Sequence, residues 1–167
     1  TIIRNNIIFD HKPISYGGLS LHPGSGARVY NNTIYGNKIG LSINGSGVIA
    51  RNNIIYGNTM NVELTGSAGT VMSHNLCTGD ASCVITTNPL FVNASANDFH
   101  LLSTSPAINA GADLAADGVT QDFECTPRPQ GSGWDIGADE FGPPGASCGG
   151  PPSLPGDLNG DGARTLI

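Results

Sequence analysis

A mixed polar cluster near the start of the chain has residue types that could contact a ligand. Asp10, His11, Lys12 and Tyr16 lie in one Gly/Pro-containing stretch that interrupts an otherwise regular repeat. An inserted loop with a carboxylate, an imidazole, an amine and a phenol can bind a polar ligand. The alternative is a solvated surface loop, so these four residues are our weak ligand-binding candidates.

A second group of residues has the spacing of a metal site. Asp157, Asn159 and Asp161, followed by Gly162, match the first half of a D-x-[DN]-x-[DN]-G calcium loop. The sequence stops before the carboxylate expected at the twelfth loop position. Calcium is therefore the one cofactor that the sequence suggests, and we expect this incomplete loop to bind it weakly.

The remaining titratable residues give no catalytic assignment. Glu63 alternates with apolar residues of a predicted strand, so we expect it to point outward as an isolated, solvated carboxylate. His22, His74 and His100 are separated in sequence, which favours structural roles. One acidic set could converge on calcium or serve in turns and caps, and we favour the second interpretation: Asp113, Asp117, Asp122, Asp135, Asp139 and Glu140.

Composition narrows the class of protein. The chain has 167 residues, about one domain, and its 38% hydrophobic content is too high for a disordered chain. Seven Lys and Arg residues and a net charge of −6 leave no basic patch, so we expect no nucleic-acid partner. No apolar run is long enough to span a bilayer.

An internal repeat determines the elements that position these residues. Residues 31–37 read NNTIYGN and residues 52–58 read NNIIYGN, with weaker copies on either side. The second Asn of each copy is spaced by 26, 21 and 22 residues, at Asn6, Asn32, Asn53 and Asn75. Short apolar stretches with period two, separated by Gly/Asn turns, predict strands that must stack on the next copy to bury a core.

The sequence therefore predicts an all-β, parallel β-helix in which the four anchor Asn residues form a hydrogen-bonded ladder. The apolar pairs Leu41/Ile43 and Val62/Leu64 should stack, and Val84/Thr86 should continue the same columns. Phe9, Tyr35 and Tyr56 form an aromatic column. We favour packing for this column over the alternative, a strip that stacks on sugars.

The four cysteines lie in Gly/Asp/Pro-rich loops without paired CxxC spacing, which favours disulfides in an exported protein over a metal site. Of three possible connectivities, we predict Cys77 with Cys83 and Cys125 with Cys148.

The repeat resembles the right-handed parallel β-helix proteins of the pectin lyase-like superfamily over residues 1–93. The following stretch, NPLFVNASANDFHLLSTSPAINAGAD and then QDFECTPRPQGSGWDIGADEF, resembles the C-terminal signature of choice-of-anchor Q β-helix proteins. Asn88 and Cys125 depart from that signature. The resemblance implies that residues 94–141 form a capping segment, with Trp134 buried, that closes the last coil. Residues 142–155 read as a Pro/Gly linker, and residues 156–167 resemble the opening of a dockerin repeat.

These resemblances imply the C-terminal part of a secreted or cell-surface scaffold, either structural or associated with polysaccharide, and without catalysis in this part of the protein. Because the chain begins inside a repeat, we expect it to be part of a longer protein. The first coil could pair with another copy, giving a homo-oligomer, and the tail could bind a cohesin-like or cell-surface partner. The alternative is a polysaccharide lyase or glycoside hydrolase that acts on pectin-like acidic polysaccharide through coils upstream.

Overall fold

The computed structural model describes residues 1–11, 17–24, 26–78 and 83–143. Within these residues the parallel strands form three sheets. Sheet A contains β1 (Ile2–Arg4), β4 (Arg28–Tyr30), β7 (Ile49–Arg51) and β10 (Val71–Ser73). Sheet B contains β2 (Ile7–Phe9), β5 (Thr33–Tyr35), β8 (Ile54–Tyr56), β11 (Asn75–Cys77) and β12 (Cys83–Ile85). Sheet C contains β3 (Leu19–Leu21), β6 (Ile39–Ile43) and β9 (Met60–Leu64).

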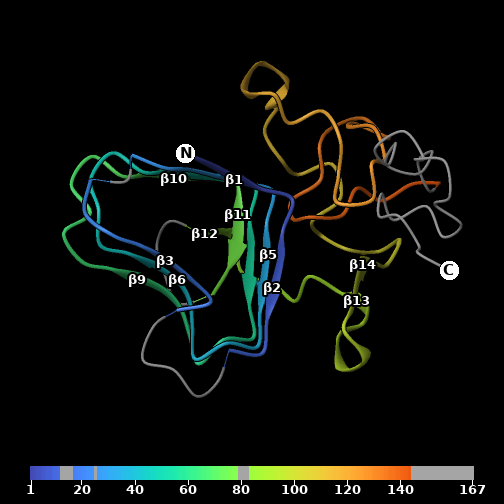
Figure 1. Cartoon of the computed structure of the whole chain (residues 1–167). Coiled ribbons are helices and arrows are strands. Elements are labelled where there is room, and N and C mark those ends of the chain that lie inside the picture. The colour runs from blue at the N-terminus through green and yellow to red at the C-terminus, as the bar shows by residue number, and fades with distance from the viewer. Residues whose placement is uncertain (12–16, 25, 79–82, 144–167) are drawn as a thin grey trace, which may run out of the picture.

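Successive coils stack in register, so that equivalent residues of the repeat lie one above the other. Ile34 pairs with Ile8 on one side and with Ile55 on the other, and Leu41 pairs with Leu19 and Val62 in the same way. In Figure 1 the coils are viewed almost along their common axis and superimpose as nested rings. The predicted all-β fold with parallel stacked coils is confirmed.

The core of the solenoid follows from the period of two along each short strand. In β4, β5, β7 and β8 the middle residue points inward, and the four side chains concerned are fully buried: Val29, Ile34, Ala50 and Ile55. The flanking residues of the same strands point outward. In sheet C the inward positions are instead the alternate residues Leu19, Leu21, Leu41 and Ile43. Because each short strand buries only one or two side chains inside, only the stack of coils completes a core.

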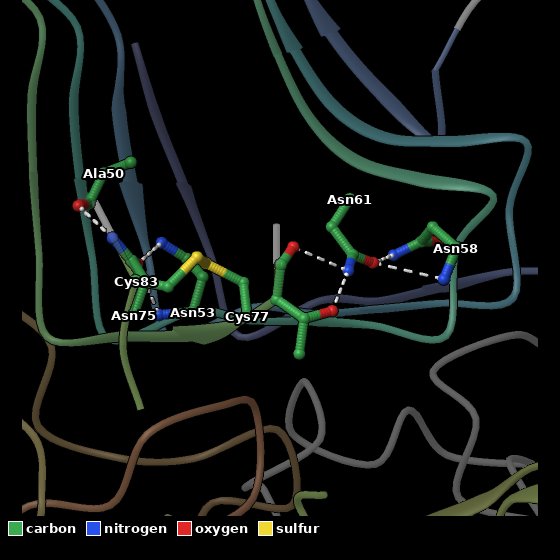
Figure 2. The surroundings of a disulfide bond; sticks show 8 residues. Ala50, Asn53, Asn58, Asn61, Asn75, Cys77 and Cys83 are labelled. Carbon is green, nitrogen blue, oxygen red and sulfur yellow. Dashed lines mark hydrogen bonds between the residues drawn. A yellow bond between two sulfur atoms is a disulfide. The ribbon is translucent and has the colours of Figure 1, made fainter. Parts of the chain in front are cut away.

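The predicted ladder is present at the turn between sheets A and B. The side-chain amide of Asn6 donates to Asn32 Oδ1 at 2.9 Å, that of Asn32 to Asn53 Oδ1 at 3.0 Å, and that of Asn53 to Asn75 Oδ1 at 2.9 Å. Asn75 ends the column by donating to the carbonyl of Ala50 (Figure 2). The ladder oxygens of Asn53 and Asn75 also accept backbone N–H groups, from Asn32 and Asn53, so these buried side-chain amides are paired.

A second ladder, which the sequence analysis missed, lies at the next turn. Asn37 Nδ2 donates to Asn58 Oδ1, and Asn58 Nδ2 donates to Asn61 Oδ1, both at 3.0 Å. Asn61 then donates to the hydroxyl of Thr78, the residue after Cys77, at 2.7 Å. Figure 2 shows Asn58 and Asn61 beside the disulfide. The signal was available, because Asn37 and Asn58 are the last residues of the two YGN sequences.

The fourth copy of the repeat departs from the prediction. We expected Val84 and Thr86 to continue the inward columns of β6 and β9, but β12 pairs with β11 in sheet B. The side chain of Val84 is 62% exposed. The Cys77–Cys83 disulfide, with a Cα–Cα distance of 5.2 Å, holds β12 beside β11, so the spacing of the earlier coils does not apply.

The C-terminal segment (residues 94–141) lies along the side of the solenoid, which corrects the expectation that it closes the last coil (Figure 1). It contains the 3₁₀ helices η1 (Ala94–Ala96) and η2 (Ala115–Asp117) and the strand β14 (Asp98–Leu101), which pairs antiparallel with β13 (Phe91–Asn93). Its apolar residues pack on outward-facing side chains of three coils: Ile54, Tyr30, Ile49 and Leu76.

The first Asn of each NN pair attaches this segment. Asn5, Asn31 and Asn52 have a positive φ, which turns their side chains away from the inner ladder. Asn31 Nδ2 donates to the carbonyls of Asp135 and Gly137, and Asn52 both donates to the carbonyl and accepts from the N–H of Ala112. The two Asn residues of one dipeptide therefore have different functions, one inside the solenoid and one outside.

Candidate functional site

The structure describes two of the four residues of the predicted ligand cluster. Asp10 follows β2 with a φ of 61° and lines a groove on the outer face of sheet B. The backbone N–H of His11 donates to Asn37 Oδ1 at 2.9 Å, so His11 caps the second ladder. Lys12 and Tyr16 lie outside the described residues.

The tail residues also lie outside the described part of the chain: Asp157, Asn159, Asp161 and Cys148, with residues 144–155 of the predicted linker. Cys125 is disulfide-bonded, but its predicted pairing with Cys148 involves a residue outside that part. Within the described ranges, no group of three or more His, Cys, Asp or Glu side chains is placed to hold a metal ion.

The acidic set of the C-terminal segment is used in turns and caps, the interpretation that we favoured. Asp122 accepts the N–H groups of Glu124 and Thr126, and Asp139 accepts that of Leu101 at 2.8 Å. Further members bond in the same manner: Asp113 to Ala115, and Asp135 to Asn109 and Phe141. Asp117 accepts the Tyr30 hydroxyl. Asp113 and Asp122 therefore hold local turns, whereas Asp117, Asp135 and Asp139 also join parts of the chain that are far apart in sequence.

A buried ion pair, which sequence reasoning missed, connects the two halves of the signature. Arg128 Nη1 lies 2.7 Å from Glu140 Oε2, and both side chains are buried. Arg128 Nη2 also donates to the carbonyls of Gly137 and Ala138. Burial raises the pKa of Glu140, and the N–H of Gln130 and the charge of Arg128 oppose that shift. The one signal in the sequence was an Arg between two prolines, followed by a Glu in the DIGADEF stretch.

The outer face of sheet C carries a polar strip. Ser20, Ser42 and Glu63 are register partners on β3, β6 and β9, and they line a hollow of about 210 Å³ with His22. The Ser42 hydroxyl donates to Glu63 Oε2 at 2.6 Å. Glu63 points outward as predicted, but the expectation that it is isolated was wrong.

The aromatic column is both packed and accessible. Phe9, Tyr35 and Tyr56 are register partners on β2, β5 and β8. The Phe99 ring lies 5.3 Å from the rings of both Phe9 and Tyr35, and the Phe91 ring meets Tyr35 edge-on at 5.8 Å. Phe9 is nevertheless 36% exposed. The packing that we favoured exists, and an open side remains.

Two hollows lie along this column. The larger, of about 380 Å³, is lined by Phe9, Asp10, Tyr35, Ser95 and Asn97. The smaller, of about 190 Å³, is lined by Tyr35, Tyr56 and Phe91. Both hollows share Tyr35 and Ala94. We call the two together the aromatic groove; it lies between the outer face of sheet B and residues 88–102.

His100 connects β14 to the loop at Glu124. Its Nδ1 lies 2.6 Å from Asp98 Oδ1, and its Nε2 lies 3.2 Å from Glu124 Oε2. Burial lowers the pKa of His100, but hydrogen bonds to Asp98 and Glu124 and the charge of Asp139 raise it by more, so the pKa lies above its ordinary value. These contacts agree with the structural role that the sequence analysis favoured.

The stacked sheets, the internal Asn ladders and the side-packed segment define a parallel β-solenoid protein. Residues 1–103 match the family model described as "Right handed beta helix region", and the chain belongs to this right-handed β-helix family. Searches of curated proteins and of solved structures found no match. Within the described residues there is no helix with the length and apolar character needed to cross a membrane.

Proposed function

We propose that this chain is an extracellular or cell-surface β-helix scaffold that associates with polysaccharide and performs no catalysis in the described region. The observation that supports this proposal is that its buried charged groups are bonded within the fold. Arg128, Asp135, Asp139 and Glu140 are buried and bond to one another or to backbone groups. Groups committed in this way hold the fold and are not positioned to act on a substrate.

The proposed location outside the cell is supported by the cysteines. Cys77 and Cys83 form a disulfide, Cys125 is also disulfide-bonded, and the described residues contain no free cysteine. Disulfides persist in oxidising compartments. The resemblance of residues 156–167 to a dockerin opening is consistent with attachment to a surface, with calcium as the ion that such a loop binds.

The polar strip on sheet C raises one alternative, a hydrolase or lyase that acts on acidic polysaccharide. Glu63 is the carboxylate that lines this hollow. Hydrolysis of a glycosidic bond normally uses two carboxylates on either side of that bond. The described lining supplies one of them, and it already accepts a hydrogen bond from Ser42. This arrangement favours the scaffold.

The test incubates the whole chain with a panel of neutral and acidic polysaccharides, with and without calcium. New reducing ends report hydrolysis, and absorbance of the unsaturated product reports elimination. We expect retention on at least one immobilised polysaccharide and no cleavage. Cleavage that disappears in Glu63→Gln would establish the alternative, and a lack of retention on every polysaccharide would overturn the association.

A further inference from the structure

Resting on the proposed association with polysaccharide, we propose that the aromatic groove binds a neutral polysaccharide chain that runs parallel to the solenoid axis. The direction follows from the register. Phe9, Tyr35 and Tyr56 succeed one another on neighbouring strands, which in a parallel sheet are about 4.8 Å apart. The groove therefore presents one ring per coil along a line, which suits an extended polymer better than a compact ligand.

The rings of the groove are held before a ligand arrives. Tyr35 is packed by Phe99 on one side and by the edge of Phe91 on another, and Phe91 and Phe99 are themselves perpendicular at 5.3 Å. A Cβ at Gly57 would lie 2.8 Å from the Tyr35 ring, so the ring lies directly against that turn. Binding to rings fixed in this way loses little side-chain entropy.

The rim of the groove supplies polar partners beside the rings. Asp10, Ser95 and Asn97 line the larger hollow, and Asn88 lines the smaller one. A sugar ring has apolar C–H faces and a periphery of hydroxyls. An aromatic floor with carboxylate, hydroxyl and amide groups at its edge matches both parts of that ring.

Charge selects between neutral and acidic polysaccharides. The described lining residues include no Lys, Arg or His that could pair with the carboxylates of an acidic glycan. The chain as a whole also has a net charge of −6. A polyuronate would place its carboxylates in this negative potential, whereas a neutral glycan meets no such repulsion. The groove thus favours a neutral polysaccharide as its ligand over pectin-like acidic polysaccharides.

Ala94 offers a direct test because it lines both hollows at their junction. Ala94→Leu should fill the junction, and Ala96→Leu is the matched control, since Ala96 lies in the same 3₁₀ helix, is exposed and is not among the lining residues. The probes are soluble hydroxyethyl cellulose, arabinoxylan and galactan, with polygalacturonate as the acidic comparison. Retardation in affinity electrophoresis and titration calorimetry report binding by the whole chain.

We expect at least one neutral probe to bind wild type and Ala96→Leu equally, with binding at least about tenfold weaker for Ala94→Leu. Polygalacturonate should bind none of them. Equal binding of a neutral probe by wild type, Ala96→Leu and Ala94→Leu would overturn the assignment of the groove as the binding site, while leaving the association with polysaccharide intact. Polygalacturonate binding that Ala94→Leu abolishes would overturn the assignment of a neutral ligand. A lack of binding to every probe would overturn the proposed function itself.

Discussion

The coils and the C-terminal segment satisfy their buried polar groups by different means. In the coils, neutral amides such as Asn32 and Asn53 bond to the same residue type in the next coil. In the segment, Arg128 and the carboxylates around it each have a different set of partners. A repeated neutral ladder distributes its bonds over many coils, whereas a buried charge depends on one arrangement. The segment should therefore be more sensitive to a single substitution.

The two regions can be followed separately. Trp134 is the single tryptophan of the chain, and it is buried in the segment against Tyr30 and Leu114. Its fluorescence reports the segment, while far-UV circular dichroism is dominated by the strands of the coils. Denaturation followed by both probes can show whether the regions unfold together.

The largest effect is expected at the centre of the charged network. Arg128→Met should lower the free energy of unfolding by about 3–5 kcal/mol, because Glu140 stays buried without its partner. Urea denaturation followed by Trp134 fluorescence measures the change. The matched control is Arg28→Met, since Arg28 donates to the carbonyl of Gly26 at the surface. Similar losses in both variants would contradict the dependence of the segment on this pair.

The next effect concerns the inner ladder. Asn53→Leu should cost about 3 kcal/mol, because it removes an amide that bonds Asn75, Val29 and Arg51 and leaves buried groups unpaired. Asn44→Leu is the control at an exposed position on the same solenoid, with a change near zero. Far-UV circular dichroism during thermal unfolding measures both, and equal shifts would show that the ladder does not stabilise the coils.

A smaller effect is expected at the outer Asn column, where the two regions meet. Asn52→Gly removes both bonds to Ala112 without strain at the positive φ of 56°. We expect a loss of about 1–2 kcal/mol, seen first in Trp134 fluorescence. His74→Gly is matched to it, because His74 has the same backbone conformation and is exposed. An equal change in both variants would argue against a role of the column in attachment.

The same contrast explains what the sequence could reveal. The coils repeat, so aligning Asn32 with Asn53 gave the strands, the parallel stacking and the inner ladder together. The fourth copy was misplaced because spacing alone does not show that the Cys77–Cys83 disulfide holds β12 beside β11. The second ladder was visible in the repeated YGN sequences but was not interpreted.

The C-terminal segment has no repeat from which to infer position. Its acidic residues were expected in turns, but the pairing of Arg128 with Glu140 depends on how the irregular loop between them folds, which no sequence pattern shows. The same is true of Phe91 and Phe99, which approach Tyr35 only because the segment lies along the side of the coils. The aromatic column was therefore predictable from the sequence, and the groove was not.

The smallest effect is a pH dependence confined to the segment. Because the folded pKa of His100 lies above its ordinary value, its bonds to Asp98 and Glu124 stabilise fully below about pH 6.5 and are lost as the pH rises through the folded pKa. The His100 side chain is 42% exposed, so solvent screening limits the gain to less than about 1 kcal/mol.

The measurement is the free energy of unfolding of wild type and of His100→Gln, followed by Trp134 fluorescence. The difference between the two proteins should be present at about pH 5.5 and small at about pH 8.5. His22→Gln should keep the wild-type profile. If His100→Gln also keeps the wild-type profile, the charge of the imidazole does not join β14 to the Glu124 loop. Among the described residues, the ion pair of Arg128 with Glu140 would then be the one pair of charged side chains that stabilises the segment.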